Sequence, residues 1–152
     1  MAKIIYHCFG GTHSSVLAAA VHLNILQKGR LPSNRDILNC PYFDRINKNS
    51  SGKMFFVGVD EMGHEIFTMG CRGAGSIVET AVKDVLYSMG IDDKDIIMMD
   101  TKPSLNFLMK MGGFLSRRLN LITTGRLLLF SGSRISFNRI VGLVEKVKKD
   151  KV

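Results

Sequence analysis

The order of apolar and polar positions along the chain predicts alternating strands and helices. Short runs of apolar, β-branched and aromatic residues predict buried strands, and longer segments with apolar residues every three or four positions predict helices. The expected strands are 3–8, 54–59, 64–69, 96–99 and 127–130. The expected helices are 14–29, 76–90, 105–119 and 136–149, with one further helical turn after Ser33.

Turn and capping signals between these segments predict the fold class. The sequence Asp60-Glu61-Met62-Gly63 lies between two expected strands and predicts a β-hairpin. Ser76 and Glu79 form the pattern of a capping box, which opens a helix that closes at Gly90. Gly112-Gly113 interrupts another helical pattern and predicts either a break or a close helix contact. The order of elements predicts an α/β protein, a three-layer sandwich with a mostly parallel sheet and one hairpin.

Size and composition bound the remaining possibilities. The chain has 152 residues, of which 45% are hydrophobic, and we expect a single α/β domain over residues 1–152 with a basic C-terminal tail at 146–152. Three cysteines form no disulfide framework, which favours a reducing compartment. No apolar run reaches the roughly 18 residues of a membrane helix, and the N-terminus lacks the pattern of a signal peptide. We therefore expect a cytoplasmic protein with no membrane partner.

Positive charge is concentrated in the last third of the chain. The net charge is +8, yet residues 1–101 hold 10 Lys/Arg and 11 Asp/Glu, whereas residues 102–152 hold 11 Lys/Arg and 2 Asp/Glu. Such asymmetry attracts polyanions, so nucleic acid is one possible partner. Aromatic residues that would stack bases are not interleaved with these charges, and a solvated basic helix explains them equally well. Arginines of this segment could instead bind a small anion.

Three glycine- and serine-rich loops lie at expected strand-to-helix joins, at residues 8–15, 70–76 and 131–134. Glycine lets the backbone approach an anion closely, and a helix N-terminus offers free N–H groups and positive potential. Loops at the carboxyl ends of parallel strands share one edge of the sheet. Such residues are also common at helix starts, but three loops with two arginines favour a phosphate-like anion site. The expected ligand-binding residues are Gly10, Gly11, Thr12, Ser14, Ser15, Arg72 and Arg134.

Known phosphate-binding motifs fit the first loop only in part. A Walker motif needs lysine at the helix start, and Thr12-His13-Ser14-Ser15 has none, which disfavours an ordinary ATPase or GTPase. The glycine spacing also differs from the dinucleotide-binding fingerprint. The phosphate-binding loop of a cysteine-dependent phosphatase begins with Cys and ends with Arg-Ser/Thr. Cys8 and Ser15 fit the two ends of this pattern. Ser14, however, occupies the position where low-molecular-weight tyrosine phosphatases have arginine. A phosphatase would need Arg72 or Arg134 as a substitute.

The segment from Cys8 to Ser15 resembles the Cys-x-x-Gly-x-x-Thr/Ser-Ser loop of the IIB components of sugar phosphotransferase systems. That resemblance covers eight residues and implies a phosphorylated Cys8 thiolate activated by the helix N-terminus. Without this role, Cys8 is a small buried residue at the end of a strand. His13 is the candidate proton partner, or else a solvent-facing residue at the helix start. Cys8 and His13 are therefore the candidate catalytic residues, and the sequence leaves open whether the protein is an enzyme.

Over most of its length the chain resembles domain-of-unknown-function family 3189, which occurs mainly in Firmicutes. The matching segments are Ile4–Cys8, Gly10–Ser15, Pro41–Arg45 and Met111–Leu119. This resemblance implies no established chemistry. No Cys-x-x-Cys or His-x-x-x-His spacing is present, and we expect neither a metal nor a cofactor.

The sequence therefore predicts a protein that binds a phosphorylated small molecule or another small anion at its strand-end loops. An enzymatic form would use Cys8 in phosphoryl transfer. The alternatives are a nucleic-acid-binding protein that uses the basic last third, or a non-catalytic regulatory or interaction module.

Overall fold

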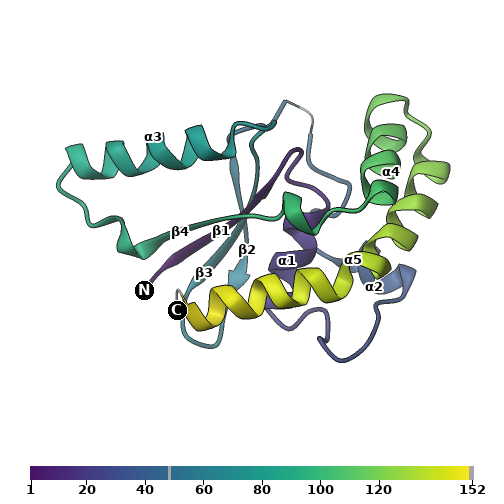
Figure 1. Cartoon of the computed structure of the whole chain (residues 1–152), viewed down its shortest axis with the longest axis horizontal. Coiled ribbons are helices and arrows are strands. Elements are labelled where there is room, and N and C mark those ends of the chain that lie inside the picture. Colours follow the sequence, from purple (N-terminus) through teal and green to yellow (C-terminus); the bar gives the residue numbers. More distant parts are fainter. Residues whose placement is uncertain (48, 151–152) are drawn as a thin grey trace.

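A computed structural model describes residues 1–47 and 49–150 and has helices on both faces of a four-stranded sheet (Figure 1). The strands are β1 (Lys3–Cys8), β2 (Met54–Val59), β3 (Glu65–Gly70) and β4 (Ile96–Asp100), in the order β2-β3-β1-β4. β1 is parallel to both β3 and β4, and β2 forms an antiparallel hairpin with β3. The α/β class, the mostly parallel sheet and the hairpin are confirmed.

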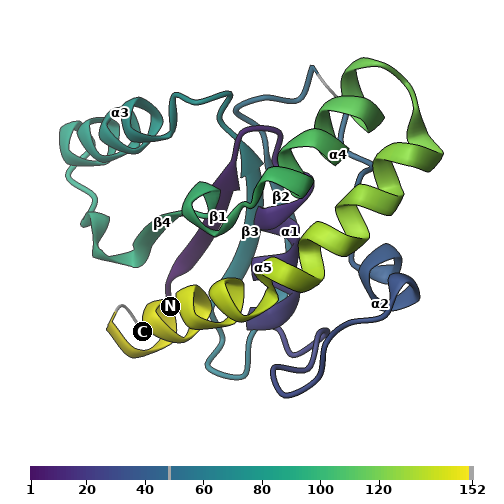
Figure 2. The ribbon, with the colours of Figure 1, turned by 45° about the vertical axis from the view of Figure 1, so that its right-hand side comes forward.

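Five α-helices connect or follow the strands of the described chain. They are α1 (Ser14–His22), α2 (Asn34–Asn39), α3 (Gly75–Ser88), α4 (Phe107–Arg118) and α5 (Ile122–Asp150), with two short 3-10 helices, η1 (Asp93–Asp95) and η2 (Lys102–Ser104). α1 and α5 cover one face of the sheet and α3 lies over the other, while α4 and α5 form a helical hairpin (Figure 2). The expected third layer is therefore α3.

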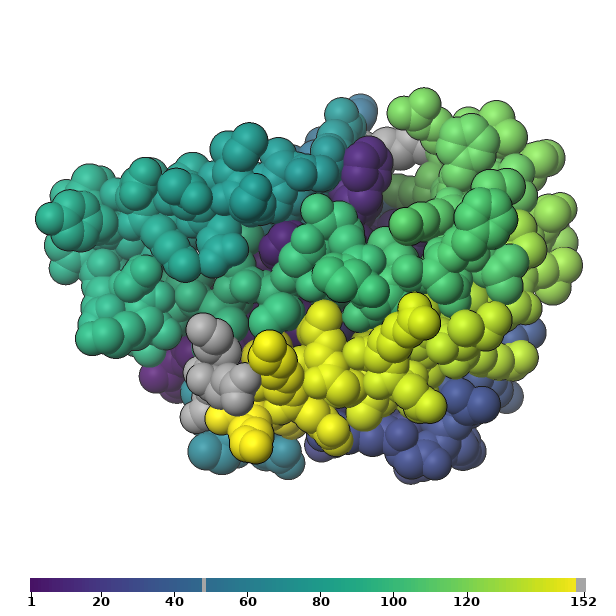
Figure 3. Space-filling view, in the orientation of Figure 1, coloured from purple at the N-terminus to yellow at the C-terminus, as the bar shows by residue number. Residues whose placement is uncertain are grey.

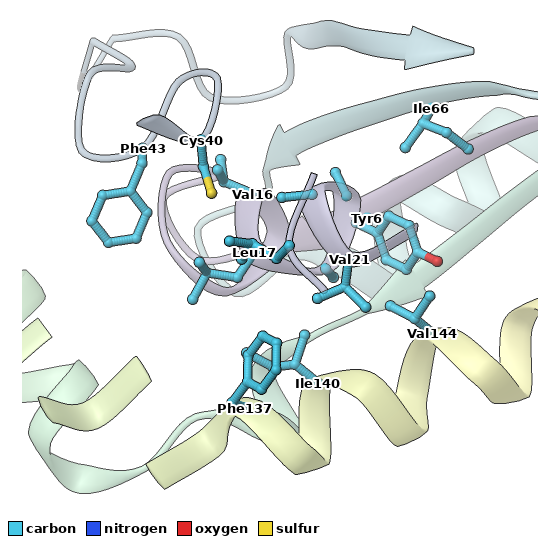
Figure 4. Close-up of a cluster of buried hydrophobic side chains, with 14 of the residues drawn as sticks. Tyr6, Val16, Leu17, Val21, Cys40, Phe43, Ile66, Phe137, Ile140 and Val144 are labelled. Atoms are coloured by element: carbon cyan, nitrogen blue, oxygen red, sulfur yellow. The ribbon is translucent and has the colours of Figure 1, made fainter. Parts of the chain in front are cut away.

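The main hydrophobic core lies between the sheet, α1 and α5 (Figure 4). Every residue of α1 is buried, because this helix has the sheet on one side and α5 on the other. Figure 4 shows Phe137 and Ile140 of α5 pointing toward Leu17 of α1, and all three side chains are almost completely buried. A helix that is buried on all sides needs apolar residues all round, which explains the uninterrupted apolar sequence of α1.

The start of α3 corrects the expected capping box. The helix begins at Gly75 with Ala74 as its N-cap, so Ser76 does not cap it. A Cβ atom at Gly75 would lie 2.4 Å from Cε1 of His7 on β1, which explains why glycine occupies the first turn against the sheet. A capping box forms instead at α2, where Ser33 and Asp36 exchange hydrogen bonds, at the expected helical turn.

The last quarter of the chain differs from the expectation. The expected strand 127–130 and the expected loop 131–134 both lie within the single helix α5. Small residues allow this helix to approach α4 closely, since a Cβ at Gly112 would lie 2.7 Å from the carbonyl oxygen of Gly125. Gly112-Gly113 therefore marks a close helix contact, and α4 is continuous there. Residues 146–150 of the expected tail continue α5, and 151–152 lie outside the described residues.

α5 is long and apolar enough to span a membrane by length and composition alone. However, 44% of its most apolar 18-residue window is buried within the protein. The buried positions include Phe137, Ile140 and Val144, which pack against α1 and the sheet. Packing in the core accounts for the apolar residues at these buried positions.

Candidate functional site

A cleft with a volume of about 720 Å³ opens at the carboxyl ends of the parallel strands, between the loop that follows β1 and helix α4. In Figure 3 the purple N-terminal segment reaches the surface between the teal segments and green α4. The basic residues that line the cleft are Arg72, Lys102, Lys110, Arg117 and Arg118. No aspartate or glutamate from the described residues lines it. The cleft therefore has a strongly basic wall.

Cys8 lies at the base of this cleft, at the end of β1. Its Sγ atom accepts a hydrogen bond from the backbone N–H of Gly11 at 3.1 Å and lies 3.3 Å from the Ser15 hydroxyl. The side chain lines the cleft although only 5% of the residue is exposed. A bound ligand would thus approach the sulfur from the cleft side alone.

The three hydroxyl groups expected to hold an anion are engaged inside the protein. Thr12 Oγ1 donates to the carbonyl of Tyr42 at 3.1 Å. The Thr101 hydroxyl donates to the carbonyl of His7, so Ser14 Oγ, 2.8 Å from Thr101 Oγ1, is the donor in that pair. Ser15 Oγ lies 2.8 Å from the hydroxyl of Thr68 on β3. These hydroxyls fasten the loop to the sheet and to Tyr42, and basic side chains supply the charged groups of the cleft wall.

The first two glycine-rich loops lie together, as expected from their positions after parallel strands. Gly11 has a positive φ of 69°, and a Cβ atom there would lie 2.4 Å from the backbone nitrogen of Gly70. This close approach brings Arg72 to the cleft, where its Nε donates to the Ser51 hydroxyl at 2.7 Å.

The third expected loop does not reach the cleft. Arg134 lies within α5, and its guanidinium donates to the carbonyl of Pro32 at 3.0 Å and to Asn34 Oδ1 at 2.8 Å. It lines a separate, open depression with Arg30 and Ser33. The expectation that Arg134 joins the other loops is wrong, because the segment that contains it is helical.

His13, at the N-terminus of α1, is oriented by Asp44. Its Nε2 atom lies 3.2 Å from Asp44 Oδ1, and because the carboxylate can only accept, Nε2 carries the proton. The other ring nitrogen, Nδ1, faces Gly113 of α4, where a Cβ atom would lie 3.3 Å from it. His13 and Gly113 both line the cleft. Nδ1 is therefore the ring nitrogen that is not bonded to Asp44.

Asp44 is a buried carboxylate that links His13, at the N-terminus of α1, to both helices of the C-terminal hairpin, α4 and α5. It accepts hydrogen bonds from Ser116 of α4 at 3.0 and 3.1 Å and from Arg126 of α5 at 3.2 Å. Burial raises the pKa of Asp44, but these hydrogen bonds and the one from His13 outweigh it and lower the pKa to about 2. The carboxylate is therefore ionised throughout the neutral range.

The sequence analysis did not assign Lys102 or Lys110 to the site, and it included Arg117 and Arg118 only among the arginines of the basic last third that could bind a small anion. Lys102 follows β4, so the rule that strand ends share one edge could have found it. It forms an ion pair with Asp100 at 3.2 Å. Arg117 donates to the carbonyl of Ile46, and with Lys110 and Arg118 it reaches the cleft from α4. No sequence signal shows that α4 turns toward the first loop.

Metal-binding clusters are absent from the part of the chain that the structure describes. No group of three or more His, Cys, Asp or Glu residues there could hold a metal ion. Cys8, Cys40 and Cys71 are all free and buried. Burial raises the pKa of Cys40 to about 12, with a further contribution from Asp36.

The fold and the site define a class: an α/β sandwich with a basic cleft at the carboxyl edge of its sheet. Residues 3–149 match the family described as protein of unknown function (DUF3189), and the chain belongs to this family. The match extends over nearly the whole chain, whereas the resemblance to phosphotransferase IIB components covers eight residues and has no support from these comparisons. No curated protein and no solved structure matches the chain.

Proposed function

We propose that this protein binds a phosphorylated small molecule or another small anion in the cleft beside Cys8. The observation that carries this proposal is the convergence of five basic side chains, from three separate segments, on a cleft whose described lining has no carboxylate. Assembling so many like charges costs electrostatic free energy, which a bound anion would offset. Three of these five side chains belong to α4, and the other two follow β3 and β4.

The N-terminus of α1 supports the same proposal. His13 occupies the N-cap position, but no side chain caps the helix. The first N–H groups of an α-helix have no partner within the helix, and together with the helix dipole they attract anions. Thr12, His13 and Ser14 line the cleft at this point. An anion beside Gly10 would therefore meet backbone donors on one side and basic side chains on the other.

A catalytic form of this function would use Cys8 as the nucleophile, because its sulfur lines the same cleft. After its proton passes to solvent, the thiolate would attack the phosphorus of a bound phosphate ester. The S–P bond forms while the P–O bond to the leaving alcohol breaks, and protonated His13 gives the Nδ1 proton to the leaving oxygen. A binding module needs the cleft alone, so a Cys8→Ser variant would still bind the anion.

A nucleic-acid surface is less well supported, because much of the basic last third is used within the protein. Arg126 bonds to Asp44, Arg134 to Pro32 and Asn34, and Lys148 lies 3.4 Å from Glu61. These contacts fasten α5 to other elements. Fewer charges are left to contact phosphates along an extended strand.

The proposal can be tested by thermal denaturation with inorganic phosphate, sulfate and pyrophosphate. An anion that binds only the folded state should stabilise it by about 2.7 kcal/mol at a hundredfold excess over its Kd. A Lys110→Ala/Arg118→Ala variant should lose this effect. Arg139→Ala removes an exposed α5 charge that does not line the cleft, and it should retain the effect. If no anion raises the Tm of the wild-type protein, the proposal is wrong.

A further inference from the structure

The cleft has an apolar part as well as a basic one. Phe9, in the loop after β1, is 58% exposed, and Phe114 of α4 is 48% exposed. Both line the cleft, together with Leu105 and Met109. Large apolar side chains beside a group of charged residues are a common feature of ligand sites, where they cover the apolar part of the ligand.

Phe114 lies on the same face of α4 as the basic residues. Lys110 precedes it by four positions, and Arg117 and Arg118 follow by three and four, so the side chains are neighbours on the helix surface. An aromatic ring bound against Phe114 would stack on a phenyl group and also meet a guanidinium plane. Phe9 offers a second aromatic surface from another element of the cleft.

The number of basic residues indicates more than one phosphate group. A single phosphate monoester carries a charge of about −1.5 to −2 at neutral pH, whereas four basic side chains line the cleft besides Lys102, whose charge is paired with Asp100. Two or three linked phosphates match this positive charge more closely. The volume of about 720 Å³ falls within the range of sites for small-molecule ligands and leaves space for a ring system beside the phosphates.

From these features we infer that the ligand is an aromatic ring system joined to two or more phosphates, the chemistry of a nucleoside di- or triphosphate. This inference rests on the proposed function. The polyphosphate would lie among Lys102, Lys110 and Arg118, and the ring would pack against Phe9 or Phe114. The first loop has no Walker lysine, and in this arrangement Lys102 after β4 and the basic residues of α4 would bind the phosphates in its place.

The test compares adenosine triphosphate with inorganic triphosphate, which has phosphates but no ring, and with adenosine, which has a ring but no phosphate. Isothermal titration of the full-length protein at fixed ionic strength would give each Kd. Adenosine triphosphate should bind at least about fivefold more tightly than inorganic triphosphate, since stacking of one base has an effect of this size or larger. Adenosine should bind much more weakly than either. Guanosine and cytidine triphosphates would show whether one base is preferred.

Variants of the two phenylalanines decide where the ring lies. Phe9→Ala or Phe114→Ala should weaken the binding of adenosine triphosphate about fivefold or more and leave inorganic triphosphate unchanged. Phe107→Ala is the matched control, since Phe107 is also on α4, is 72% exposed and does not line the cleft. All three side chains are substantially exposed, so the variants should fold, and circular dichroism would verify this.

Each outcome is decisive. If adenosine triphosphate and inorganic triphosphate bind equally, the aromatic part of the inference is overturned and the anion site stands. The same conclusion follows if only Phe107→Ala weakens nucleotide binding, or if neither cleft variant does. If no phosphate compound binds, the inference and the proposed function are both wrong. If adenosine alone binds as tightly as its triphosphate, the polyphosphate part is overturned.

Discussion

The imidazole of His13 and the carboxylate of Asp44 lie 3.2 Å apart, although 31 positions separate them in the chain. Through Ser116 and Arg126 the same carboxylate also holds α4 and α5. Asp44 therefore connects the N-terminus of α1 with the helical hairpin that forms the other wall of the cleft. Its removal should affect both the stability of the protein and the shape of the cleft.

An Asp44→Asn substitution should destabilise the protein by about 3 kcal/mol, because three hydrogen-bond donors, from His13, Ser116 and Arg126, lose a buried charged acceptor. The measurement is the free energy of unfolding in urea at neutral pH. Asp84→Asn, which changes an exposed carboxylate on α3, is the matched control and should have almost no effect. Equal stability of the two variants would contradict the structural role of Asp44.

The contribution of Asp44 should depend on pH. Its pKa in the folded protein is about 2, below the ordinary value of 3.8, so its ionised form stabilises the fold. This stabilisation, about 2 kcal/mol, is complete above pH 3.8 and is lost as the pH falls from 3.8 toward 2. The difference in unfolding free energy between wild type and Asp44→Asn should therefore shrink in this window. A difference that stays constant down to pH 2 would show that the carboxylate is not ionised preferentially in the fold.

The contact between α4 and α5 should tolerate no side chain at Gly112. A Cβ atom there would lie 2.7 Å from the Gly125 carbonyl oxygen and 2.8 Å from the backbone nitrogen of Leu129. Gly112→Ala should thus separate the two helices and lower the free energy of unfolding by at least about 2 kcal/mol. Gly142→Ala, on the open side of α5 with nothing within 4 Å, should raise it by about 0.5–1 kcal/mol. Thermal or urea unfolding would show opposite signs for the two variants.

Two adjacent glycines of the first loop should respond differently to alanine. Gly11 has φ of 69°, and a Cβ there would lie 2.4 Å from Gly70, so Gly11→Ala should strongly destabilise the loop. A Cβ at Gly10 would meet only Thr12, at an ordinary 3.6 Å, so Gly10→Ala should fold normally. Tm values of the two variants would test this difference. Similar Tm values would mean that the loop after β1 and the loop after β3 are not in close contact at Gly11 and Gly70.

The three cysteines should differ in their reaction with iodoacetamide. Burial raises the pKa of Cys40 to about 12 and also raises that of Cys71, so neither thiol should react in the folded protein near pH 8. Cys8 alone lines the cleft, and its labelling should slow when pyrophosphate is bound. Mass spectrometry of digested protein would locate the label, and labelling in urea would show that all three thiols can react. Fast labelling of folded Cys40 would contradict its buried position.

The sheet could be predicted from the sequence because each strand is a short apolar run with clear turn residues beside it. β1 and β4 end at the expected residues within one position, and the hairpin turn at Asp60–Gly63 joins the expected strands. α5 could not be predicted so easily. Leu127 to Phe130 reads as a strand when taken alone, and Ser131-Gly132-Ser133 reads as a loop. Gly132 lies within this helix, and glycine is required there because a Cβ would lie 2.7 Å from the Met109 side chain of α4, which the local sequence does not show.

The candidate site was predictable to the extent that it follows strand ends. Cys8, His13 and Arg72 were expected in one place and all line the cleft. The hydroxyls of Thr12, Ser14 and Ser15 were also expected near the loop, but sequence alone does not show which way a side chain points, and all three bond inward. The position of the basic residues of α4 depends on how the hairpin of α4 and α5 packs against the first loop, and no local sequence pattern predicts that packing.

The cleft joins the beginning of the chain to its end, and this affects when the site can form during synthesis. Cys8 and His13 are made well before α4 and the part of α5 that holds it in place. Until residues 107–150 have left the ribosome, the first loop lacks its opposite wall and Asp44 lacks Ser116 and Arg126. A nascent chain that still lacks residues 107–150 should therefore lack the complete cleft.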